Sequence, residues 1–322
     1  MRTYVLRRLL QLIPLLLAVV TLSFLLLKLA PGDYLTTLSE NPQVSAATID
    51  AMRHRFGLDR PWTVQLALYL KNLVLHLDFG ESFSRHQPVF AVLREGLFNT
   101  LLLASSAAAV TWGLAIPLGV IAAVRQHGAA DRILSVLAFA WLSVPEVLSG
   151  LLLLFLAART GWFPVGGMHS IDWDELSVGG RAIDLVRHLA LPALVTGLVP
   201  LASRMRQMRG ALLDVLRLEY VTTARAKGLP EWSVVMKHAL RNALNPLITL
   251  FGYTLGALVS GSFVAEIVFG WPGLGRITYE ALTSRDPYLV VGAVMMAAVV
   301  LVIGNLIADL LLAAADPRIA HE

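Results

Sequence analysis

Six long apolar runs constrain this chain more than any other feature of its sequence. In a helix that rises about 1.5 Å per residue, a run of about 20 apolar residues crosses the roughly 30 Å hydrocarbon core of a membrane. Only 15% of the 322 residues are charged, whereas soluble domains are about 25% charged. We therefore predict an all-α integral membrane protein with six transmembrane helices, at residues 9–30, 98–124, 133–158, 189–203, 246–269 and 288–314.

The first run raises the alternative of a cleaved signal peptide. Arg7 and Arg8 precede it, as basic residues do in a signal peptide, but the run is longer than a signal-peptide core and no Ala-x-Ala site follows. An uncleaved anchor is therefore favoured. The fourth run is the weakest, because Pro192, Gly197 and Pro200 predict a kinked helix there.

The spans divide the chain into four predicted regions. Residues 1–30 form a cytoplasmic amino-terminal end and the first span, and residues 31–97 form an external loop region. Within that loop, 46–56 and 64–77 have helical periodicity. Residues 98–314 form the core transmembrane domain with a cytoplasmic loop at 204–245, and 315–322 form a cytoplasmic tail.

The distribution of Lys and Arg predicts the orientation. Short loops rich in these residues stay on the cytoplasmic side of a membrane. The loop at 204–245 carries eight Lys/Arg against three acids, and the predicted cytoplasmic segments together carry 14 Lys/Arg. The two short external connections carry five, and the loop at 31–97 is too long for the rule to apply to it strictly. Both termini and the 204–245 loop are therefore predicted to be cytoplasmic, and the net charge of +4 needs no nucleic-acid partner to explain it.

The 204–245 loop also has a helical pattern. Residues 209–227 predict one helix, Gly228 predicts its end, and Pro230 with Glu231 suits the start of another. Small side chains before Gly228 would let another surface approach closely, and Arg225 and Lys227 flank Ala226 where they could reach acids on a partner. The alternative is a solvated basic loop that only sets the membrane topology.

Three acidic residues fall in or near the apolar runs. Glu146, Glu266 and Asp309 would each cost about 2.5–3.5 kcal/mol at the centre of a bilayer, so they are expected to face a cavity or a partner. Glu146 is a candidate for the lining of a substrate path and Glu266 for the path or its outer gate. Packing roles are the alternative for both, and Asp309 is interpreted as structural.

The sequence lacks the motifs of several kinds of catalytic and metal-binding site. There is no cysteine, so no disulfide or thiolate chemistry is expected. There is no Gly-x-x-x-x-Gly-Lys-Ser/Thr phosphate loop, no His-Glu-x-x-His and no Gly-x-Ser-x-Gly. The eight His residues have no ligand spacing, so no metal site is predicted, and the chain is not expected to be an enzyme.

The stretch Tyr220–Gly228 (YVTTARAKG) resembles the cytoplasmic signature of the dipeptide/oligopeptide/nickel permease family of ABC importers, in its first-permease branch. The general signature has Glu-Ala-Ala, three residues and Gly; here Thr222, Thr223 and Ala224 occupy the first three positions. Further family-like stretches run in order along the whole chain: Tyr4–Leu9, Ala30–Asp33, Phe56–Pro61, Phe79–Ser82, Asn99–Leu101, Gly161–Gly167, His238–Ala243, Glu266–Phe269, Trp271–Gly275 and Asp316–Arg318.

The resemblance implies a type I ABC importer permease fold in a prokaryotic inner or plasma membrane. This chain would pair with a second, usually different permease to form a path for di- or oligopeptides or related solutes. Two cytoplasmic ATPase subunits would bind ATP and Mg, so this chain would need no cofactor, and an external binding protein would deliver the substrate. The ATPase-coupling residues would be Tyr220, Thr222, Thr223, Ala224, Arg225, Ala226, Lys227 and Gly228, and Asn99 joins Glu146 and Glu266 as a path candidate.

Other functional classes fit the sequence less well. An ion-gradient-driven secondary transporter would favour paired intramembrane acids and bases and matching broken helices, whereas the three acids here are isolated. A membrane-embedded hydrolase lacks its catalytic motifs. An exporter or receptor subunit of the ABC class is disfavoured by the long loop after the first span and by the signature at 220–228.

Overall fold

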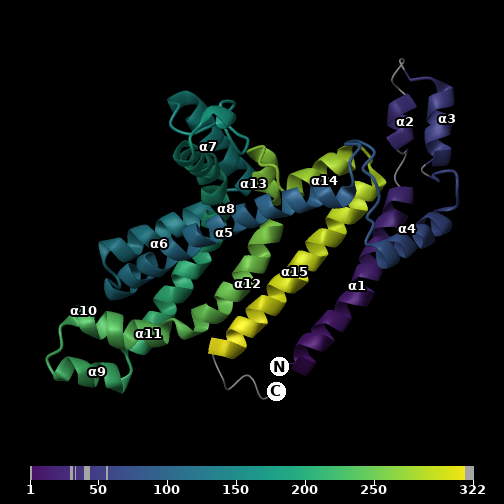
Figure 1. The fold of residues 1–322 in the computed structure, drawn as a ribbon. Coiled ribbons are helices and arrows are strands. Elements are labelled where there is room, and N and C mark those ends of the chain that lie inside the picture. The colour runs from purple at the N-terminus through teal and green to yellow at the C-terminus, as the bar shows by residue number, and fades with distance from the viewer. Residues whose placement is uncertain (1, 30–31, 33, 40–43, 56, 316–322) are drawn as a thin grey trace. The chain divides into compact units, whose positions relative to one another are not determined.

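The computed structural model describes residues 2–29, 32, 34–39, 44–55 and 57–315, and this part of the chain consists of helices and their connections (Figure 1). The stretches that include Ala30, Pro31, Asp33 and Phe56, and the predicted tail with Asp316–Arg318, lie wholly or partly outside the described residues. No β-strand occurs among the described residues, and a single isolated bridge joins Glu81 to Pro88. The helices are α1 (Arg2–Leu29), α2 (Tyr34–Ser39), α3 (Ala46–Arg55), α4 (Trp62–His76), α5 (Val89–Val124), α6 (Ala129–Leu142), α7 (Glu146–Thr160), the 3-10 helix η1 (Trp173–Glu175), α8 (Val178–Leu216), α9 (Glu219–Ala226), α10 (Glu231–Ser233), the π-helix η2 (Val234–Ala239), α11 (Leu240–Ala243), α12 (Asn245–Gly261), α13 (Phe263–Val268), α14 (Leu274–Thr283) and α15 (Pro287–Ala315).

Four helices in the described part of the chain are long and apolar enough to cross a membrane: α1, α5, α8 and α15. The pair α6 and α7 passes the same test as a fifth span, but the two helices are bent by 102°. The prediction of one continuous helix at 133–158 is therefore wrong. Pro145 disfavours helical backbone at the residue before it, so α6 ends at Leu142 and α7 begins after the proline.

Two other predicted spans differ in their bounds. The run at 189–203 is the middle of α8, a helix of 39 residues that contains both Pro192 and Pro200. The run at 246–269 is divided at Ser262 into α12 and α13. Because α12 has 17 residues, the described residues give four or five spans by length and composition, where the sequence predicts six.

The predicted helices of the long loop are confirmed as α3 and α4. Gly57 follows α3 with a φ of +64°, a conformation that glycine adopts without strain. Leu77 ends α4 in the left-handed conformation. Its N–H bonds to the carbonyl of Leu73, and the N–H of Asp78 bonds to the carbonyl of Asn72.

The chain forms two compact units, each built from separated segments. The first contains residues 1–100 and 272–302, and the second contains 101–271 and 303–322. In the first, Val20 and Phe24 of α1 pack with Tyr69 of α4 and Val291 of α15. The four regions predicted from hydropathy describe membrane topology instead, and they stay a prediction.

Helices α5 and α8 of the second unit approach each other closely. A Cβ added at Gly119 of α5 would lie 2.8 Å from the carbonyl oxygen of Met205, and one at Gly197 of α8 would lie 2.7 Å from that of Ala107. Small residues allow such backbone contact between membrane helices. This packing fixes the helix from which the segment 217–233 continues.

Candidate functional site

The segment after α8 turns sharply before the family-like stretch. The N–H groups of Arg217 and Leu218 bond to the carbonyls of Asp214 and Val215, and Leu218 has extended backbone. Helix α9 then starts at Glu219. The prediction of one helix over 209–227 is therefore wrong, and the turn allows α9 to fold back onto its own chain.

One side of α9 is buried in this chain. Val221 is inaccessible and Ala224 is 7% exposed, and they share a cluster with Leu212 of α8 and with Val234 and Ala239 of η2. Residues three apart lie on the same face of a helix. Ala224 therefore packs inward, and it does not offer the open approach surface expected of the small residues before Gly228.

The opposite side of α9 does offer an open surface with small side chains. At about 100° per residue, Glu219, Thr222, Thr223 and Ala226 point away from the buried face, and all four are exposed. Three of them have small side chains. An approaching protein surface would therefore come close to the backbone of α9 on this side.

Arg225 ties α9 to α10 across the turn. Its Nη2 and Nε donate to the two carboxylate oxygens of Glu231, at 2.7 and 3.1 Å. The hydrogen bond from Arg225 lowers the pKa of Glu231 below its usual value. Arg225 is thus engaged within the chain, whereas Lys227, the second predicted cation, is exposed.

Tyr220 anchors the other end of α9. Its hydroxyl accepts a hydrogen bond from Asn242 Nδ2 at 2.7 Å and donates to the carbonyl of His238 at 3.4 Å. His238 belongs to η2, and π-helical turns are frequent at functional sites. The short helix is therefore held at both ends and along one face.

Gly228 provides the turn between α9 and α10. Its φ is +76°, and no neighbouring heavy atom lies within 4 Å of the position of a Cβ. The constraint on this position therefore comes from backbone conformation, as predicted from the sequence, and not from a lack of space.

Large apolar side chains are exposed on the same segment. Trp232 is 74% exposed, and Leu218, Tyr220 and Leu229 are also exposed. Trp232 borders a groove of about 300 Å³ between α10 and the end of α5, with Val120, Ile121, Val124, Arg125, Glu231 and Val235. Exposed tryptophan and tyrosine side chains are enriched at the centres of protein interfaces. The sequence prediction did not include Leu218, Leu229 and Trp232, although each is a large apolar residue inside a charged loop.

Glu146, a path candidate, is the first residue of α7 and follows the bend at Pro145. It is half-buried, and its Oε1 is enclosed with no hydrogen-bond partner among the described residues. An enclosed carboxylate oxygen without a partner is costly, and a bound group would offset that cost. The position is consistent with the predicted role but does not test it.

Glu266 and Asn99 have structural partners. Glu266 of α13 is inaccessible to solvent and accepts a hydrogen bond from Ser262 at 2.9 Å. Asn99 belongs to the other unit, where its Nδ2 donates to the carbonyl of Pro272 at 2.9 Å. Glu146 and Glu266 lie on helices that pack together, α7 and α13. A path role for any of the three stays a prediction.

Comparison with known proteins identifies the family. Residues 115–321 match the family described as binding-protein-dependent transport system inner membrane component, and residues 1–104 match its amino-terminal companion. The chain is 39% identical to the oligopeptide transport system permease protein AppB of Bacillus subtilis and 36% identical to the di/tripeptide transport system permease protein DppB of Pseudomonas aeruginosa. Both alignments cover 100% of each chain.

A solved structure shares the fold. An inward-facing structure of the MetNI methionine ABC transporter matches 70% of this chain and 96% of its own, with a TM-score of 0.56 and 18% identity. That likeness concerns the fold alone, and it confirms the predicted fold class. The chain belongs to the family of inner-membrane permease components of binding-protein-dependent transport systems, and it has the all-helical fold of a type I ABC importer permease.

Proposed function

We propose that this chain is one of two permease subunits of an ATP-driven peptide importer and that α9 couples it to a cytoplasmic ATPase. Both named relatives are peptide permeases, and they match over the whole chain. An external binding protein would deliver the peptide, and two ATPase subunits would bind ATP and Mg. The second permease would be a related but different chain.

The arrangement of α9 is the observation that carries the coupling role. A coupling element must transmit force, so it has to be stiff and fixed to the helices that move. Val221, Tyr220 and Arg225 fix α9 to its own chain, while its outward face stays exposed. Trp232, on the next helix of the same segment, is exposed as well. A loop that only set topology would need neither the anchoring contacts nor an exposed aromatic side chain.

Reconstitution tests the transport function and its energy source. The purified chain would be assembled in proteoliposomes with its second permease, its ATPases and its binding protein, and uptake of a radiolabelled tripeptide would be measured. We expect uptake that requires ATP and the binding protein and that persists when ionophores abolish ion gradients. Uptake driven by an ion gradient without ATP would support the alternative of a secondary transporter and contradict the proposal.

A further inference from the structure

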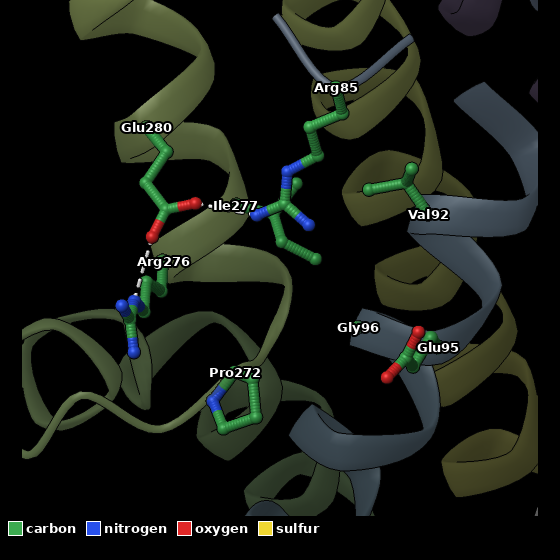
Figure 2. Close-up of a pocket in the computed structure, with 8 residues that line it drawn as sticks. All are labelled: Arg85, Val92, Glu95, Gly96, Pro272, Arg276, Ile277 and Glu280. Carbon is green, nitrogen blue, oxygen red and sulfur yellow. Dashed lines mark hydrogen bonds and ion pairs between the residues drawn. The ribbon is translucent and has the colours of Figure 1, made fainter. Parts of the chain in front are cut away.

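A second candidate site lies in the first unit, away from α9 in the sequence. A cavity of about 280 Å³ lies between α14, the start of α5 and the loop that precedes α5, and Figure 2 shows the residues that line it. Two arginines and two glutamates line it. Arg276 and Glu280 are on α14, Glu95 is on α5, and Arg85 is in the loop before α5. The full lining is Arg85, Val92, Glu95, Gly96, Pro272, Arg276, Ile277 and Glu280.

Glu280 holds the two arginine side chains of this cavity in place. It accepts hydrogen bonds from Arg85 Nη2 at 2.5 Å and from Arg276 Nε at 2.8 Å (Figure 2). Burial raises the pKa of Glu280, but the hydrogen bonds and charges of the two arginines together outweigh it, so the pKa lies below its usual value. The carboxylate is therefore ionised at neutral pH and holds the Arg85 side chain at the cavity.

Arg85 keeps donors for a ligand. A guanidinium has five N–H groups, and the bond to Glu280 uses one of them. The other N–H groups of its side chain have no partner among the described residues. A planar guanidinium fixed in this way is suited to a carboxylate.

Glu95 supplies the opposite charge. It projects from α5, on the wall that faces α14 in Figure 2, and it forms no hydrogen bond or ion pair with another described residue. The cavity thus offers an open cation at Arg85 and an open anion at Glu95. Val92, Pro272 and Ile277 provide apolar contacts in the same cavity.

We infer that this cavity binds a small zwitterion, a short peptide whose carboxylate meets Arg85 and whose ammonium group meets Glu95. The inference rests on the proposed function and adds a receiving site on the permease chain itself. A water occupies about 30 Å³ of liquid volume, so 280 Å³ is space for about nine waters and hence for a peptide of two or three residues. The charged groups are partly exposed, so weak binding, on the order of millimolar, is expected.

A direct binding measurement tests this site without the ATPases. The full chain in nanodiscs of phosphatidylglycerol and phosphatidylcholine would be titrated with dialanine, N-acetyl-dialanine and dialanine amide, with saturation-transfer NMR as the readout. We expect dialanine to bind at least fivefold more tightly than either blocked form. Glu95→Gln should remove the preference for a free amino terminus, and Arg85→Gln the preference for a free carboxylate.

Two exposed residues that do not line the cavity are the matched controls, Glu175 and Arg94. Glu175→Gln and Arg94→Gln should leave both preferences unchanged. Equal binding of the three ligands, or preferences that survive Glu95→Gln and Arg85→Gln, would overturn the inference. The inference would also be overturned if, in nanodiscs that contain phosphatidylethanolamine, the cavity bound the headgroup of that lipid but did not bind dialanine.

The outcome is separable from that of the proposed function. Absence of dialanine binding together with ATP-dependent peptide uptake by the assembled complex would reject the receiving site and leave the importer proposal in place. Peptide binding to the cavity in a chain whose uptake needs no ATP would support the site and reject the ATP-driven importer.

Discussion

Gly228 occupies a backbone conformation that other residues adopt only with strain. Because open space surrounds the position of its Cβ, Gly228→Ala should cost about 1 kcal/mol through φ alone. Gly210→Ala is the matched control, since Gly210 also has open space but lies in the helix α8, where alanine is favoured. Thermal unfolding of the two purified variants measures the difference. An equal effect of both substitutions would contradict the strained turn.

The Arg225–Glu231 pair gives a pH dependence. The pKa of Glu231 is lower in the folded chain than in the unfolded one, so the pair stabilises the turn above the unfolded pKa. That contribution is lost as the pH falls through the folded pKa. Because both side chains are substantially exposed, we expect less than about 1 kcal/mol.

Hydrogen exchange of the backbone amides at 226–229 measures this effect. At neutral pH, wild type should exchange up to about fivefold more slowly than Glu231→Gln, and the difference should disappear as the pH falls through the folded pKa of Glu231. The comparison at each pH cancels the intrinsic pH dependence of exchange. A difference that does not shrink as the pH is lowered would show that the charge of Glu231 is not its cause.

Individual residues show how far the sequence could be used for prediction. Gly228 was predicted correctly because the left-handed conformation is a local property of glycine. The inward direction of Ala224 and the engagement of Arg225 were not predictable, since both depend on residues brought near by folding, Val234 and Glu231. Likewise, the sequence gives no local sign that Leu218 breaks the helical pattern.

At the scale of the element, α9 has two faces with different requirements. Ala224 lies in a packed cluster and Ala226 is exposed on the other side. We expect Ala224→Trp to overpack that cluster and destabilise the chain by about 1–3 kcal/mol or more, whereas Ala226→Trp should stay within about 0.5 kcal/mol. Membrane abundance and thermal unfolding of both variants measure this contrast. Similar losses in both would contradict the assigned faces.

The helices predicted best are those whose bounds follow from their own sequence. Helices α3 and α4 have regular apolar spacing and clear ends, and their predicted bounds agree with the structure. The bend at Pro145 and the length of α8 were predicted less well. Pro145 lies at the break between two helices, whereas Pro192 lies inside one. Whether a proline ends a helix depends on packing against neighbouring helices, which the local sequence does not show.

At the scale of the whole molecule, the predicted orientation is open to a simple labelling experiment. The chain has no cysteine, so single-cysteine variants report one position each. Lys227→Cys in α9's segment should react with a membrane-impermeant maleimide only from the cytoplasmic side. Asp174→Cys, at a side chain that is 99% exposed, should react only from outside. Labelling of both positions from one side would contradict the predicted topology.

The central claim is that the outward face of α9 transmits ATP hydrolysis to the transport path. Its most direct test is substrate-stimulated ATP hydrolysis by the complete complex carrying Ala226→Trp. The control is Ala51→Trp, which places the same side chain at an exposed alanine of α3. We expect Ala226→Trp to abolish the stimulation by substrate while its abundance stays normal, and Ala51→Trp to retain it. Full stimulation in Ala226→Trp would contradict the claim and return the segment to the role of a basic topology signal.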